Sequence, residues 1–146
     1  INLTQKAMKN KSLFLLFLFF SACLFAQRGQ TGDKTFAYRF PPDVVNKNSN
    51  ATLMVINTVD HDIIVCIRDQ NKKYISHIYI RNNERYLFKN LPIDRIYVQY
   101  KSKEFFYEDK EKTVINFGEK HTFTFFYDAS VEGNFIVISE EEFFSP

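Results

Sequence analysis

Residues 79–100 read YIRNNERYLFKNLPIDRIYVQY, and this stretch decides the fold that the sequence predicts. Apolar and polar side chains alternate over 85–89 and again over 95–101, which is the two-residue period of a β-strand. The Asn-Asn pair before the first of these strands suits a turn, because asparagine tolerates left-handed backbone angles. Pro92 has no amide hydrogen and therefore ends that strand. The stretch predicts an antiparallel meander.

The strand pattern extends upstream of this stretch. Residues 52–58 and 62–69 are apolar runs rich in β-branched side chains, and neither has a helical period. Only residues 59–61 separate them, which is short enough for a hairpin, so we expect two adjacent central strands. A further strand over 74–81 leads directly into the meander.

Downstream of the meander the strand pattern is weaker. Residues 103–112 combine three adjacent aromatics with charged neighbours and fit no simple half-buried strand. Further strands are expected over 113–117, 121–128 and 134–139. The acidic run 140–142 is expected in solvent, and Phe143 and Phe144 can pack on the sheets.

These patterns together predict an all-β fold. We expect a single antiparallel two-sheet sandwich of seven to eight strands, of the immunoglobulin or transthyretin type, preceded by a helical signal peptide. A small closed β-barrel is the alternative. The composition agrees, because 17 Phe and 8 Tyr stand against no Trp and aromatic side chains favour pleated, half-buried surfaces.

The amino-terminal segment has the features of an export signal. A short cationic head at 8–11 precedes an unbroken apolar run, and the run from Leu13 to Ala26 is shorter than the ~20 residues that a membrane-spanning helix needs. Cleavage after Ala26 is one processing route. The sequence Phe-Ser-Ala-Cys ending at Cys23 resembles a bacterial lipobox, so lipidation of Cys23 is the other. We therefore expect an exported protein that is periplasmic, secreted or at the cell surface, or lipid-anchored through Cys23.

The sequence divides into four expected segments. They are an upstream extension (1–7), the signal peptide (8–26), a linker or loose edge strand (27–50) and the β domain (51–144). Within the third segment, alternation over 36–40 suggests a short edge strand that ends at a Pro-Pro pair. Without residues 1–26 the chain has 16 basic and 17 acidic residues, a net charge of −1. This balance argues against binding to nucleic acid or to an anionic membrane surface.

The sequence contains no motif for catalysis. There is no Gly-x-Ser-x-Gly nucleophile motif, the four glycines are scattered, and Cys66 lies in an apolar run where an inert, buried thiol is expected. His61, with its neighbours Asp60 and Asp62, could bind a metal ion only if His77 or His121 approached from other strands. We therefore expect no catalytic, cofactor-binding or metal-binding residues, no cofactor and no enzymatic activity.

The aromatic excess is the feature that points to binding. Phe105, Phe106 and Tyr107, with Tyr97 and Tyr79 facing outward, could form a platform for a glycan or a partner protein. The alternative is that a small sandwich without tryptophan fills its core with phenylalanine and tyrosine.

The segment 90–98 resembles the Leu-Pro-x-Gly-x-Tyr-x-Val segment of transthyretin-like, carboxypeptidase-regulatory-type sandwiches, and the resemblance extends over residues 52–101. Asp94 stands where that family has Gly, and Ile96 where it has Tyr. The resemblance implies an exported bacterial β-sandwich domain of uncharacterised function. We therefore expect a non-enzymatic protein of the bacterial cell envelope that acts through protein contacts, and the alternative is a carbohydrate-binding module that uses the aromatic cluster.

Overall fold

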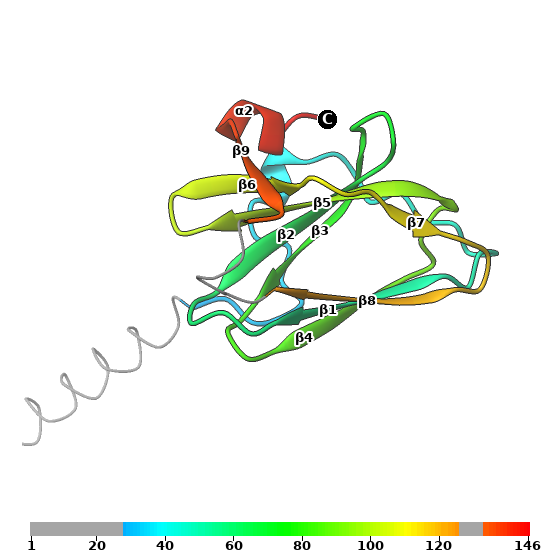
Figure 1. Cartoon of the computed structure of the whole chain (residues 1–146), viewed down its shortest axis with the longest axis horizontal. Coiled ribbons are helices and arrows are strands. Elements are labelled where there is room, and N and C mark those ends of the chain that lie inside the picture. The colour runs from blue at the N-terminus through cyan, green and yellow to red at the C-terminus, as the bar shows by residue number, and fades with distance from the viewer. Residues whose placement is uncertain (1–27, 126–132) are drawn as a thin grey trace, which may run out of the picture.

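The computed structural model describes residues 28–125 and 133–146, which form two packed β-sheets and a short carboxy-terminal helix (Figure 1). The strands are β1 (Thr52–Asn57), β2 (Ile63–Arg68), β3 (Tyr74–Ile80), β4 (Arg85–Lys89), β5 (Asp94–Ser102), β6 (Phe105–Asp109), β7 (Thr113–Ile115), β8 (Lys120–Phe125) and β9 (Phe135–Ile138). The helices are η1, a 3-10 turn at Ala37–Arg39, and α2 (Glu140–Phe143). The expected signal peptide, Cys23 and the end of the strand expected over 121–128 lie outside the described residues.

The two sheets differ in size. The small sheet has the order β4-β1-β8, and the large sheet has the order β3-β2-β5-β6-β9, with β7 paired to β5. Because the described strands form two separate sheets, the closed barrel is wrong and the two-sheet expectation is confirmed. The strands number nine within the described residues, because residues 105–109, which were expected outside any simple strand, form β6.

The meander expected from residues 79–100 does not form. Strand β3 lies in the large sheet, β4 pairs with β1 in the small sheet, and β5 returns to the large sheet beside β2. The hairpin expected between β1 and β2 is wrong for the same reason, since these strands lie in different sheets. Alternation shows where each strand lies along the chain, but it does not encode which strand is its partner.

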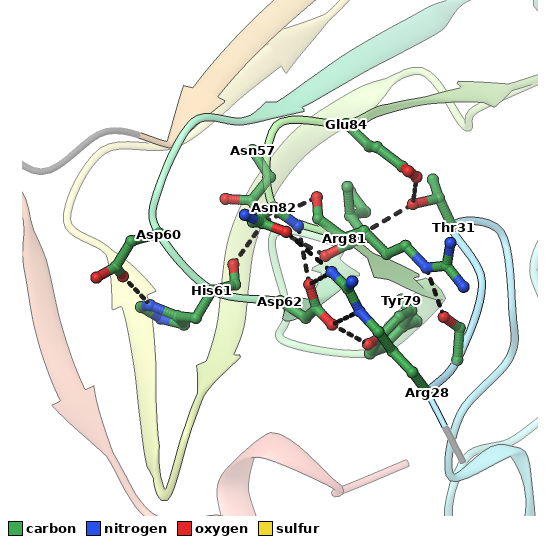
Figure 2. A network of polar contacts seen from close by, with 12 residues as sticks. Arg28, Thr31, Asn57, Asp60, His61, Asp62, Tyr79, Arg81, Asn82 and Glu84 are labelled. Carbon is green, nitrogen blue, oxygen red and sulfur yellow. Dashed lines mark hydrogen bonds and ion pairs between the residues drawn. The ribbon is translucent and has the colours of Figure 1, made fainter. Parts of the chain in front are cut away.

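Asn57 stabilises the connections through which the chain crosses from one sheet to the other. Its buried side-chain amide donates to the carbonyl oxygens of His61, Ile80 and Arg81 at 2.9, 3.3 and 3.2 Å (Figure 2). Its side-chain oxygen accepts from the Val59 amide at 3.1 Å. One side chain therefore binds backbone at both crossings, from β1 to β2 and from β3 to β4.

The small sheet also departs from the antiparallel expectation. Strand β8 runs parallel to β1, with Val55 opposite Phe123, while β4 pairs antiparallel on the other side of β1. The two sheets pack through one hydrophobic core that draws on both of them. Its buried members include Leu53, Val55 and Phe88 of the small sheet and Val65, Ile78 and Val98 of the large sheet.

The opposite face of the large sheet, which we call the covered face, packs against both ends of the described chain. Phe36 and Phe40 from the amino-terminal segment and Phe143 and Phe144 from the carboxy-terminal segment pack against its aromatic cluster, and α2 lies over β6 and β9 in Figure 1. The edge strand expected over 36–40 is absent, because η1 occupies 37–39. The segment is still held by backbone bonds, such as Val44 amide to Ile75 carbonyl at 2.8 Å.

Coverage of both faces explains why β2 is buried throughout. Its odd-numbered residues point into the core between the sheets, and Ile64 and Cys66 lie in the cluster on the covered face. Burial raises the pKa of the Cys66 thiol to about 12, so the thiolate is scarcely populated near neutral pH. The expectation of a buried thiol is confirmed.

Candidate functional site

The five aromatic residues expected to form one platform do not share a surface. Phe106 lies in the cluster on the covered face, whereas Phe105 and Tyr107, its neighbours on β6, project to the opposite side. Tyr79 and Tyr97 lie on the covered face as well, because they pair with Ile64 and Arg68 of β2, whereas Phe105 is 59% exposed on the other side. The continuous platform is therefore wrong, because consecutive residues of a strand alternate between its faces.

The covered-face members of this set are held by their own chain. The Phe106 ring lies 5.1 Å from that of Phe143, and the Tyr79 hydroxyl donates to Asp62. The Tyr97 ring contacts two ammonium groups, at 3.7 Å from Lys72 and 5.0 Å from Lys112.

An open cleft lies between the sheets at the side where β6 and β9 extend the large sheet, and we call it the aromatic cleft. Its volume is about 1140 Å³. Among the described residues, five aromatic side chains line it: Tyr100, Tyr107, Phe123, Phe125 and Phe135. Phe123 and Phe125 come from β8 of the small sheet, and the other three come from β5, β6 and β9 of the large sheet.

The aromatic rings of the cleft contact one another. Tyr100 stacks on Tyr107 with ring centres 4.9 Å apart and meets Phe125 and Phe135 edge-on at 4.8 and 4.9 Å. Tyr107 is only partly buried, and Phe123 and Phe135 are also partly exposed. Burial raises the pKa of Tyr100 to about 12, so its hydroxyl stays protonated near neutral pH. The walls are therefore ordered rings with accessible edges or faces.

Strand order explains why these rings remain accessible. Beyond β5, the large sheet continues into β6 and β9, and none of the buried members of the core between the sheets comes from these two strands. Val137 of β9, which lies opposite Tyr107, is 69% exposed. The inner side of β6 and β9 is thus less covered than the rest of the large sheet.

Polar side chains share the cleft with the aromatic rings. Asp60, His61, Ser102, Lys103, Asp109 and Glu111 all line it. Burial raises the pKa of the Asp109 carboxyl above its ordinary value, although the Glu111 amide donates to its Oδ1 at 3.0 Å. These groups offer both hydrogen-bond donors and carboxylate acceptors next to apolar walls.

His61 joins two other side chains at the cleft. Its Nδ1 lies 2.6 Å from Asp60 Oδ1, and its Nε2 contacts the Ser102 hydroxyl. The pKa of Asp60 is lowered, chiefly by the hydrogen bond from His61. Sequence reasoning missed Ser102, because a single serine at the end of a strand carries no local signal.

The three histidines do not converge. His77 lies under the amino-terminal segment, where its ring stacks on Phe40 at 4.1 Å, and burial lowers its pKa. His121 lies on β8, and its Nε2 is 3.0 Å from the carboxylate of Glu119, which directly precedes the strand. Within residues 28–125 and 133–146, no three metal-ligating side chains come together. The arrangement does not support the metal site considered for His61, His77 and His121.

Asp62, two residues after Asp60, has a different role. Arg28 donates to both of its carboxylate oxygens at 2.9 and 2.8 Å, and the Asn82 amide donates to Oδ1 at 2.9 Å (Figure 2). The hydrogen bond from Arg28 is the main reason that the pKa of Asp62 lies far below its usual value. Asp62 therefore fastens the amino-terminal segment, whereas Asp60 and His61 lie at the cleft.

No family model, curated protein or solved structure matches this chain. The similarity of residues 90–98 to transthyretin-like sandwiches therefore stays a prediction. In the part of the chain that the structure describes, no helix is both long and apolar enough to cross a membrane.

Proposed function

We propose that this chain is an exported binding protein of the bacterial cell envelope and that the aromatic cleft binds a carbohydrate. The leader expected over residues 8–26 supports export, and the two packed sheets are compatible with a transthyretin-like sandwich. The observation that carries the binding proposal is that partly exposed aromatic rings and hydrogen-bonding side chains line the same cleft.

A carbohydrate fits this combination of groups. A sugar ring has apolar faces of C–H groups, which pack on aromatic rings such as Tyr107, and a rim of hydroxyl groups. Asp109 and Glu111 can accept hydrogen bonds from such hydroxyls, and Ser102 can donate or accept. A purely apolar ligand would instead leave these carboxylates desolvated without partners, at a substantial cost.

The test is binding of the mature chain to a panel of immobilised glycans, followed by titration calorimetry with any glycan that is retained. Tyr107→Ala removes a cleft ring, and we expect affinity to fall about tenfold, because an aromatic contact contributes about 0.5–1.5 kcal/mol beyond the burial of its area. Tyr97→Ala is the matched control, since Tyr97 contacts Lys72 and Lys112 outside the cleft. An equal loss in both variants, or no retained glycan, would contradict the proposal.

Protein contact is the second candidate function, and exposed apolar side chains favour it. Phe105 and Val137 project from β6 and β9, and both are well exposed to solvent. Strand β9 is also an edge strand of the large sheet among the described residues, and edge strands are where a partner chain can add a strand. A photo-crosslinker at position 137 should trap one reproducible envelope protein in cells, and Val137→Glu should release it. Crosslinks without a reproducible partner would count against this function.

A further inference from the structure

We infer that Asp60, His61 and Ser102 form a nucleophilic triad that hydrolyses a carbohydrate ester held in the aromatic cleft. The inference rests on the proposed function for the choice of a carbohydrate, because the triad lines the same cleft. The sequence alone predicts no enzyme, since these residues match no nucleophile motif. Triads are recognised by geometry and not by sequence order.

The contacts have the order that acyl transfer needs. Asp60 Oδ1 lies 2.6 Å from His61 Nδ1, and the opposite ring nitrogen, Nε2, contacts Ser102 Oγ. With the imidazole proton on Nδ1, His61 donates to the carboxylate and accepts from the serine hydroxyl. The serine is thus beside a base whose other nitrogen is held by a third group.

Sheet register brings the three residues together. Ser102 is the last residue of β5 and lies opposite Ile63, the first residue of β2. Asp60 and His61 occupy the connection that enters β2, so the pairing of β2 with β5 carries them to Ser102, which lies 41 residues after His61. His61 is 26% exposed at its side chain, which leaves its ring partly accessible from the cleft.

The reaction balances with water as the only co-reactant. Ser102 Oγ forms a bond to the acyl carbon while His61 Nε2 takes the hydroxyl proton; the bond from the acyl carbon to the sugar oxygen then breaks, and that oxygen takes the proton. Water next attacks the acyl-serine and gives a proton to His61. The acyl–Oγ bond breaks, and Oγ regains the proton. The products are a carboxylic acid and the free sugar hydroxyl.

Lys103 supplies positive charge at the same place. It lines the cleft directly after Ser102, and its charge contributes to the lowered pKa of Asp60. An ammonium group near the reacting carbonyl can stabilise the oxyanion of the tetrahedral intermediate. Lys103 is therefore the residue that we assign to this role, and Lys103→Met should slow the reaction about tenfold.

The exposure of the Asp60 side chain predicts that the three residues of the triad contribute unequally to the rate. The Asp60 side chain is 89% exposed, so water screens its interaction with His61. We expect Asp60→Asn to reduce the rate about 3- to 10-fold. His61→Gln removes the base and should reduce it about 100-fold. Ser102→Ala removes the nucleophile and should lower the rate to that of buffer.

The experiment uses p-nitrophenyl acetate as substrate and a fluorophosphonate as the covalent serine probe, both independent of the natural glycan. Release of p-nitrophenol by the mature chain should disappear in Ser102→Ala and persist in Ser145→Ala, whose hydroxyl bonds to the Glu142 carbonyl outside the cleft. Mass spectrometry should find the probe on Ser102 in native protein and not in urea-denatured protein. Circular dichroism checks that each variant is folded. Should Ser102→Ala unfold, site-specific labelling of the unmodified chain still decides the matter.

The outcomes separate this inference from the proposed function. No labelling of Ser102 and no hydrolysis above buffer would overturn the triad, even if the chain binds a glycan. Hydrolysis that survives Ser102→Ala in a folded protein would overturn it as well. Labelling and hydrolysis that depend on Ser102, in a chain that retains no glycan from the panel, would support the triad and overturn the choice of a carbohydrate.

Discussion

The covered face of the large sheet and the aromatic cleft both combine aromatic rings with polar side chains, but the polar side chains bind different partners in the two places. On the covered face, Arg68 is fully buried, and its guanidinium donates to the Gln99 side chain and to four backbone carbonyls, three of them in the carboxy-terminal segment. At the cleft, His61 bonds to Asp60 on one side and to Ser102 on the other, beside an open volume. Polar groups that bind their own chain stabilise the fold, whereas groups at an opening can serve a ligand.

The amino-terminal half of the covered face follows the same rule. The Asp43 carboxylate accepts hydrogen bonds from Tyr74, Ser76 and Lys34 at 2.7, 2.8 and 2.5 Å. Burial raises the pKa of Asp43, but these hydrogen bonds outweigh burial and leave the pKa below its usual value. The aromatic excess seen in the sequence therefore has two uses: it covers one face of the large sheet, and it lines the cleft on the other.

Arg68→Met should have the largest effect on stability. It would leave the buried Gln99 side-chain oxygen and the backbone carbonyls of the carboxy-terminal segment without their guanidinium partner, and Gln99 in turn donates to the buried Glu108 carboxylate. Breaking a buried charged network costs about 3–5 kcal/mol of unfolding free energy, and urea denaturation of the variant would measure this loss. Arg39→Met is the control, because the Arg39–Glu140 pair is partly exposed and should contribute less than about 1 kcal/mol. Equal losses would contradict the contrast between the two kinds of environment.

The same aromatic truncation on the two sides of the large sheet sharpens the comparison. Phe143→Ala on the covered face should lower the unfolding free energy by about 3 kcal/mol, because the ring is fully buried against Phe40 and Phe106. Phe105→Ala should change it by less than about 0.5 kcal/mol. Thermal unfolding of both variants would measure the difference, and a large loss for Phe105→Ala would mean that this ring is buried in solution.

Acid should weaken the attachment of the amino-terminal segment. The folded-state pKa of Asp62 lies below its usual value of about 3.9, so its contribution is present above about pH 5 and is lost as pH falls through about 4 and below. Asp62→Asn should cost about 1 kcal/mol at pH 7 and should flatten the loss of stability in acid. Urea denaturation at pH 7, 5 and 3 measures the unfolding free energy of both proteins. Parallel pH profiles for the variant and the unmodified chain would contradict the role of Asp62.

The smallest effect is expected at the hairpin that follows Ser102. Lys103 has φ of 55°, in the left-handed region that disfavours residues with a Cβ atom. Lys103→Gly should therefore raise the unfolding free energy by about 0.5 kcal/mol, even though it slows the proposed hydrolysis. Asn83→Gly at φ of 59° is the control and should change stability less, because asparagine tolerates this region. A loss of stability in Lys103→Gly would show that its side chain holds the turn.

Sequence patterns located most strands well but paired them poorly. Strand β4 matches the expected residues 85–89, and β1, β2, β3 and β5 lie within one or two residues of the expected bounds. The exception is β6, where three adjacent aromatics hid the alternation because both of its faces carry aromatic rings. The opposite error occurred over 36–40, where a strand was predicted and none forms. Phe36 has a left-handed φ of 63°, which no alternation pattern indicates.

The candidate site was less accessible to sequence reasoning than the fold. Tyr107 was chosen for its aromatic ring and does line the cleft, but its immediate neighbour Phe106 lies on the covered face. His61 and Asp60 were considered only as metal ligands. Their partner Ser102 gave no signal, because its role depends on a contact between residues 41 positions apart.

The sequence by itself determined where most of the strands lie and that Cys66 is buried, and it predicts that residues 8–26 direct export. These properties follow from local periodicity and composition. Only the tertiary structure decided which sheet each strand joins, that residues 36–40 and 143–144 cover one face of the large sheet, and that β6 and β9 leave an open aromatic cleft beside Ser102. The physical reason is that strand pairing and burial depend on contacts between distant segments, and these contacts leave no local pattern in the chain.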